Sequence, residues 1–180
     1  DLETIYSFKS FFEKTLGSSN YESRNKKIYI NPSERMNYIF NSTINGIEES
    51  DFILLVGTNP RLEATILNAR IRKAYVKNKT KIYSIGDADD LTYPYEVIGS
   101  NTSIIKDIVQ ESHKISKQIK NSKKPIIIIG ESALQGKAGK YIFESLKEFL
   151  IKNDFINDNW NALNFLNQQA SNVGALDLGV

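Results

Sequence analysis

Residues Asp51–Arg61 read DFILLVGTNPR, and the organisation of the chain follows from this stretch. Its apolar part, Phe52–Val56, has no polar interruption, and Gly57–Pro60 ends it abruptly. A short, continuous apolar run with a sharp end is typical of a strand that is buried on both faces of a sheet. We therefore expect a central strand over Phe52–Val56.

The residues that follow this strand predict a helix. Apolar residues recur at steps of three and four: Leu62, Ile66, Leu67, Ile71, Ala74 and Tyr75. This spacing is typical of one helical face. A strand, a glycine turn and a helix make the first half of a βαβ unit, and parallel sheets bind ligands beyond the carboxyl ends of their strands. The turn Gly57–Arg61 is therefore the first candidate site.

The composition limits the kind of protein. The chain has 180 residues, and we expect one α/β domain over 1–180, a fragment of a longer subunit, with 1–32 as its least defined boundary region. It has no cysteine and one histidine, His113, so disulfides, iron–sulfur ligation, thiol catalysis and a histidine metal cage are excluded. A net charge of +2 gives no argument for nucleic acid. No apolar run approaches the roughly 18 residues of a membrane helix, so we expect no direct membrane insertion.

Hydrophobic patterns along the rest of the chain alternate between strand and helix. Strands are expected over 27–30, 81–85 and 125–129, and an extended segment over 93–99. Helices are expected over 2–16, 42–49 (with Ile44 and Ile47 inward), 102–120, 141–150 and 160–173. Residues 21–26 and 131–139 are predicted loops. This alternation predicts a Rossmann-like, three-layer α/β fold with a mainly parallel sheet.

Two glycine turns are candidates for phosphate binding. At Gly57–Pro60, free backbone amides at a strand end favour an anion and Arg61 adds a positive charge, but the GxGxxG pattern is missing and a simple tight turn is the stronger interpretation. Gly130–Lys137 reads GESALQGK, which has one residue too many for a phosphate loop. Ala138 stands where that loop needs Ser or Thr, so a glycine-rich turn is the better interpretation.

For three groups of charged residues, both a functional role and a purely structural role are considered. Asp87, Asp89 and Asp90 suit a divalent cation by their oxygens, but the calcium-loop pattern is absent and a solvated acidic loop is favoured. His113 is expected as an exposed helical histidine. One predicted helix carries four basic residues that form either a solvated face or a docking surface: Arg70, Arg72, Lys73 and Lys77.

Four stretches resemble, in order and at suitable spacing, the large iron–sulfur subunit of NADH:quinone oxidoreductase, respiratory complex I, whose C-terminal half has a molybdopterin oxidoreductase fold. They read NYIFNSTINGIEESDFILLVGTNPR, DLTYPYEVIG, KKPIIIIGESALQ and NALNFLNQQASNVGALDLG. The resemblance covers roughly 33–180 and is weakest at 1–32 and 151–158. Together these stretches are specific for that kind of subunit, whereas GTNP alone indicates only the wider superfamily.

The resemblance implies a role in electron transfer from NADH to quinone, as part of an NADH dehydrogenase. It places 4Fe-4S and 2Fe-2S clusters in an N-terminal part of the subunit that is outside this chain, and a chain without cysteine cannot hold them. It implies other subunits of the peripheral arm of complex I as partners. It also implies the cytoplasmic side of the bacterial inner membrane, or the mitochondrial matrix side, as the location.

The resemblance also implies a pterin cleft. In molybdopterin enzymes, turns matching Gly57–Pro60 and an Asp-Pro-Arg after the next strand bind the nucleotide end of the cofactor. Here the second turn reads Gly86–Asp89 (GDAD), so its proline and arginine are missing and acidic residues face an anion instead. We therefore expect a vestigial cleft formed by six residues: Gly57, Thr58, Asn59, Arg61, Gly86 and Asp87.

Three functional hypotheses remain. The first is a structural, cluster-free module of the complex I subunit with no catalytic or metal-binding residues of its own. The second is a nucleotide- or molybdopterin-binding domain of an active oxidoreductase. The third, a free-standing regulatory domain, is the least supported.

Overall fold

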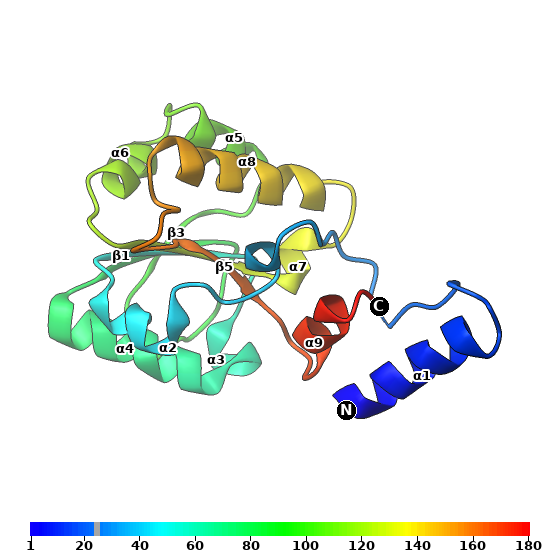
Figure 1. The fold of residues 1–180 in the computed structure, drawn as a ribbon. Coiled ribbons are helices and arrows are strands. Elements are labelled where there is room, and N and C mark those ends of the chain that lie inside the picture. Colours follow the sequence, from blue (N-terminus) through cyan, green and yellow to red (C-terminus); the bar gives the residue numbers. More distant parts are fainter. Residues whose placement is uncertain (24–25) are drawn as a thin grey trace.

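The structure is a computed structural model that describes residues 1–23 and 26–180. In these residues five strands form one parallel sheet in the order β3-β2-β1-β4-β5. The strands are β1 (Phe52–Val56), β2 (Lys81–Ile85), β3 (Glu96–Gly99), β4 (Pro125–Gly130) and β5 (Leu163–Leu166). Helices cover both faces of the sheet (Figure 1), which confirms the predicted three-layer α/β fold.

The helices divide between the two faces of the sheet, as Figure 1 shows. One face carries α5 (Ser103–Val109), α6 (Lys114–Lys120) and α8 (Gly139–Lys152). The other carries α2 (Thr43–Gly46), α3 (Pro60–Glu63) and α4 (Thr65–Asn78). The remaining helical segments are α1 (Leu2–Lys14), α7 (Glu131–Leu134), α9 (Asn172–Asp177) and two 3₁₀ turns, η1 (Arg35–Asn37) and η2 (Ile47–Glu49).

Strand β1 lies at the centre and every one of its residues is buried. Its side chains alternate between the two layers. Phe52, Leu54 and Val56 belong to the apolar cluster beneath α5, α6 and α8. Ile53 and Leu55 belong to the cluster over α4. The continuous apolar run in the sequence therefore reflects burial on both faces, as predicted.

The register of the sheet sets the position of the candidate site. Val56 pairs with Ile85 of β2 on one side and with Ile129 of β4 on the other. Consequently the residues that follow, Gly57 and Gly86, and the last residue of β4, Gly130, lie next to one another at the carboxyl edge. Two of these glycines are in close contact, because a Cβ on Gly130 would lie 2.5 Å from the carbonyl oxygen of Gly57.

The prediction of one helix over 160–173 is wrong. Residues Leu163–Leu166 form edge strand β5, parallel to β4, and α9 begins only at Asn172. The apolar residues at 163 and 166 match a helical step, but four residues also suit a buried strand, and periodicity alone does not separate the two. Trp160 holds the segment before this strand against β4, since its indole N–H donates to the carbonyl of Pro125 at 2.8 Å.

The helix predicted over 102–120 is interrupted. It consists of α5 and α6, and Glu111 between them has φ of +62°. His113 is the N-cap of α6, where its Nδ1 accepts the Ile115 amide. The residue is half-buried, so the prediction of an exposed histidine in the middle of a helix is wrong. The break lets both helices direct isoleucines to the sheet, and Ile108 and Ile115 are fully buried.

The helix after β1 is also two helices, separated at Ala64. Because the period does not continue through the break, Leu62 and Ile66 are 80% and 70% exposed. Of the later residues of the predicted face, Leu67, Ile71 and Ala74 are buried and Tyr75 is half-buried. In the preceding helical segment Ile47 is buried as predicted, but Ile44 is 49% exposed.

Two other short segments differ from prediction. The strand expected at 27–30 is a single bridge between Ile28 and Gln135. The loop expected over 131–139 contains the one-turn helix α7. Of the polar loop expected at 21–26, residues 24 and 25 lie outside the described part of the chain.

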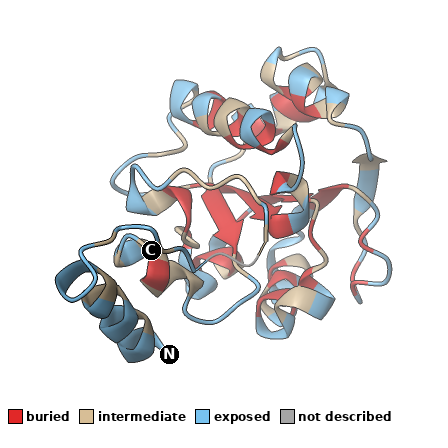
Figure 2. Cartoon of the chain, turned by 90° about the vertical axis from the view of Figure 1, so that its right-hand side faces the viewer, coloured by how far each residue is buried: buried red, intermediate tan, exposed pale blue. Residues whose placement is uncertain are grey.

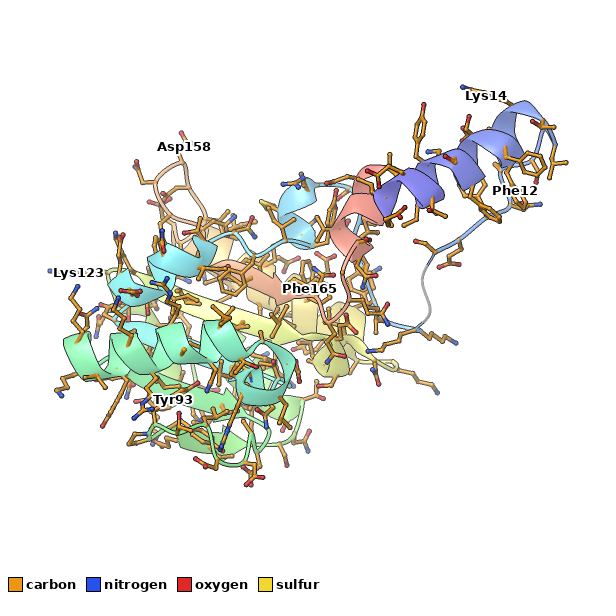
Figure 3. The ribbon with its side chains drawn as sticks, turned by 90° about the horizontal axis from the view of Figure 1, so that it is seen from below. Phe12, Lys14, Tyr93, Lys123, Asp158 and Phe165 are labelled. Atoms are coloured by element: carbon orange, nitrogen blue, oxygen red, sulfur yellow. The ribbon has the colours of Figure 1, made fainter. Side chains whose placement is uncertain are left out.

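Helix α1 projects from the body of the molecule and has no buried residue (Figure 2). It touches α9, where Leu2 meets Gly174 and the Lys9 ammonium donates to the carbonyl of Leu178. Phe12 and Lys14 lie at its far end, remote from the sheet that carries Phe165 (Figure 3). None of the helices in the described residues is long and apolar enough to cross a membrane.

The close contact between Gly130 and Gly57 leaves no room for a side chain at Gly130. Gly130→Ala places a methyl group 2.5 Å from the Gly57 carbonyl oxygen and 2.7 Å from the Thr58 Cβ, so it is expected to lower the free energy of unfolding by about 1–3 kcal/mol. Unfolding by a denaturant measures this change in the free energy of unfolding. Gly46→Ala is the control, because its nearest contact is 3.4 Å and it lies in a helix. Equal losses in the two variants would contradict the packing described.

A buried polar side chain ties strand β5 to the segment before α2. Asn164 accepts the Ser42 amide at 2.8 Å and donates to the Ser42 hydroxyl at 2.9 Å. Asn164→Ala leaves that buried amide without its acceptor and is expected to cost about 1–3 kcal/mol in the same measurement. Asn121→Ala, at an exposed position, should change stability by less than about 0.5 kcal/mol. An unaffected Asn164→Ala variant would argue against a buried β5.

Candidate functional site at the carboxyl edge of the sheet

An open cleft lies beyond the ends of β1 and β2. It has two adjoining parts of about 280 and 300 Å³, and both are lined by Gly57, Ile85, Gly86 and Ser132. The first part extends over apolar residues of α5 and α8, including Ile105 and Ile142. The second part extends over polar residues of the two turns: Thr58, Asn59, Glu63 and Asp87. Five of the six residues of the predicted vestigial cleft line this space, and Arg61 lies beside it.

The first turn is held by Asn59. Its side-chain oxygen accepts the amides of Arg61 and Leu62 at 3.1 and 3.2 Å and so caps α3, whose first residue is Pro60. Its side-chain nitrogen donates to the carbonyl of Ala88 at 2.8 Å. Asn59 therefore ties the turn after β1 to the turn after β2, through both the oxygen and the nitrogen of its side-chain amide.

Glu63 closes the same turn from the other side. One carboxylate oxygen accepts the Thr58 hydroxyl at 2.8 Å, and the other accepts the backbone amide of Asn59 at 3.0 Å. Behind the turn, Ser132 donates to the carbonyl of Gly57, while the Gly57 amide donates to Ile85 at 3.0 Å. The Thr58 hydroxyl, the Asn59 amide, and the amide and carbonyl of Gly57 are thus paired within the protein.

Arg61 is paired to the neighbouring loop. Its guanidinium donates to the carboxylate of Asp90 at 2.5 Å and to the carbonyl of the same residue at 2.8 Å. The pKa of Asp90 is lowered by the Thr92 amide and then by Arg61. The one arginine of the turn therefore faces an acidic residue of its own chain.

The second turn is acidic. The Asp87 carboxylate accepts the Asp89 amide and the Tyr95 hydroxyl, both at 2.9 Å, and these bonds lower the pKa of Asp87. The pKa of Tyr95 is raised, first by burial and then by its bond to Asp87. Asp87 is consequently ionised near neutral pH, and it adds a negative charge to the cleft.

These contacts do not fit the nucleotide end of a pterin cofactor, which carries phosphates. A phosphate needs unpaired amides, hydroxyls or arginines. Here the Thr58 hydroxyl, the Asn59 amide and the Arg61 guanidinium already have internal acceptors. Two carboxylates, Glu63 and Asp87, line the polar part of the cleft and repel an anion.

The other candidate residues lie elsewhere or have structural partners. Arg70 and Lys73 both pair with Glu48, whose pKa they lower. His113 is the helix cap described above. In the described part of the chain, no three His, Cys, Asp or Glu side chains form a group that could hold a metal ion. GESALQGK provides the end of β4, α7 and a turn, and its Ser132 contacts Gly57.

Sequence reasoning missed Glu63 and Ser132. Glu63 had no distinctive signal, because acidic residues are common in the first turn of a helix that follows a capping Asn. Ser132 had none, because it reaches Gly57 only through the pairing of β1 with β4.

Comparison with known proteins agrees with this fold. The family model described as molybdopterin oxidoreductase matches residues 1–180. The chain is 41% identical over its whole length to the NADH-ubiquinone oxidoreductase 75 kDa subunit of Reclinomonas americana, and covers 28% of that protein. It is 39% identical, over 99% of its length, to the mitochondrial NADH-ubiquinone oxidoreductase 78 kDa subunit of Candida albicans, and covers 25% of it.

A third relative is the mitochondrial NADH dehydrogenase [ubiquinone] iron-sulfur protein 1 of Solanum tuberosum, which is 34% identical over the whole chain and of which the chain covers 24%. The chain spans about a quarter of the length of these relatives. The resemblance predicted from the sequence is therefore confirmed, and it extends through 1–32, where it was expected to be weakest. The chain belongs to the molybdopterin oxidoreductase family.

Proposed function

We propose that the chain is a structural, cluster-free module of the large iron–sulfur subunit of an NADH:quinone oxidoreductase. The observation that carries this proposal is its similarity, from end to end, to proteins whose names identify them as parts of that enzyme. The chain has no cysteine to ligate iron. It takes part in electron transfer from NADH to quinone as a support for other parts of the enzyme, and contributes no catalytic residue.

The cleft supports a structural role more than a catalytic one. Its polar groups bind one another: the Thr58 hydroxyl and the backbone amide of Asn59 both donate to the Glu63 carboxylate. A site that turns over a substrate needs groups that remain free to bind it. A pterin- or nucleotide-binding domain would need such groups in the turn.

Helix α1 is the surface that best suits contact with neighbouring parts of the enzyme. Four of its large apolar side chains, or those directly after it, are about half exposed: Tyr6, Phe8, Phe11 and Leu16. Large apolar side chains that gather on one exposed helix mark interaction surfaces. We propose that this surface, from Tyr6 to Leu16, binds another part of the peripheral arm, on the cytoplasmic or matrix side of the membrane.

Co-migration tests the proposal. The tagged chain, produced in cells of its source, should migrate on a native gel with a large assembly that has NADH dehydrogenase activity. The double variant Tyr6→Ser/Phe11→Ser should reduce its recovery in that assembly by about tenfold or more, since it removes two contact side chains worth about 1–2 kcal/mol each. Val76→Ser/Ile151→Ser, at exposed apolar positions on other helices, should be recovered like the unchanged chain.

Two results would contradict the proposal. If the unchanged chain migrated alone, away from the NADH dehydrogenase activity, the module would not belong to that enzyme. If both double variants were recovered equally well, α1 would not be the contact surface.

A further inference from the structure

We propose that Glu63 is an intramolecular substitute for an anionic ligand, which keeps the turn after β1 formed and closed to phosphates. This inference follows from the observation that the cleft does not fit the phosphate-bearing cofactor of the family. It concerns one turn of this chain, so it holds or fails independently of the assembly to which the chain belongs.

The geometry of Glu63 is that of a bound anion. Its two oxygens accept two different donors of one turn, the Thr58 hydroxyl at 2.8 Å and the Asn59 amide at 3.0 Å. A phosphate binds strand-end turns through the same donor types, a hydroxyl and a backbone amide, with two of its oxygens. The carboxylate therefore occupies the positions that two oxygens of a phosphate would take.

The position of the donors explains why the turn needs an acceptor. Thr58 is only 6% exposed, so water has little access to its side chain. A donor in such a position is destabilising unless it has an acceptor. Glu63 lies one short helix away and is half-buried, so it supplies that acceptor without any ligand.

The neighbouring side chains make the turn a poor place for a second anion. Both ends of the Asn59 side chain are used, and Pro60 has no amide hydrogen to offer. Arg61 is paired with Asp90, and Asp87 lines the same part of the cleft. An entering phosphate would have to displace the Glu63 carboxylate and then lie beside a second negative charge.

Anion rescue tests this inference on the purified chain. Glu63→Ala should lower the melting temperature by several degrees, because it leaves both donors unpaired. Added formate, which has a carboxylate of its own, and pyrophosphate should each restore part of that loss. Neither anion should raise the melting temperature of the unchanged chain above that in sodium chloride of equal ionic strength.

Two further variants make the test specific. Glu63→Gln keeps one oxygen acceptor, so its melting temperature should lie between those of the unchanged chain and Glu63→Ala. Glu49→Ala removes a carboxylate that pairs with Lys124 outside the cleft, so formate and pyrophosphate should not rescue it beyond the salt control.

The inference would be overturned by either of two results. The first is that pyrophosphate stabilises the unchanged chain as much as Glu63→Ala, because the turn would then be open to phosphates. The second is that formate and pyrophosphate fail to raise the melting temperature of Glu63→Ala above the salt control. If Glu63→Ala does not fold, the same comparison with Glu63→Gln decides the question.

Discussion

The parallel pairing of β1 between β2 and β4 is the constraint on which the rest of the structure depends. Because every residue of β1 is buried, a slip of one residue would turn Phe52, Leu54 and Val56 toward the wrong layer of helices. The register is therefore fixed, and it brings the ends of three strands together at Gly57, Gly86 and Gly130. The cleft at the carboxyl edge is a consequence of this packing, whether or not a ligand enters it.

That cleft has the location, but not the chemistry, of a cofactor site. The fold places two turns where parallel sheets usually bind ligands. The polar groups of these turns bind one another instead: the Glu63 carboxylate accepts the Thr58 hydroxyl and the Asn59 backbone amide, and Arg61 pairs with Asp90. We infer that the module keeps the architecture of its family because other parts of a larger enzyme pack on it, and that internal hydrogen bonds have replaced the contribution of a ligand to stability.

The sequence predicted those parts of the fold that depend on strong local patterns. Continuous apolar runs identified β1 and β4, a short segment ended by Gly86 identified β2, and the glycines at these strand ends located the cleft. It failed where tertiary contacts decide the outcome. Leu163–Leu166 is a strand because β4 offers a free edge, and α5 and α6 separate at Glu111 so that both reach the sheet. Glu63 was overlooked because a carboxylate in the first turn of a helix is ordinary, and only the geometry shows which donors it binds.

We propose that this member of the molybdopterin oxidoreductase family acts without the cofactor of that family. The most direct measurement is the molybdenum and guanine nucleotide content of the native assembly, purified from source cells through a tag on this chain and analysed after denaturation. We expect neither molybdenum nor guanine nucleotide in proportion to the chain. A molybdenum atom and a guanine nucleotide for each copy of the chain would contradict it.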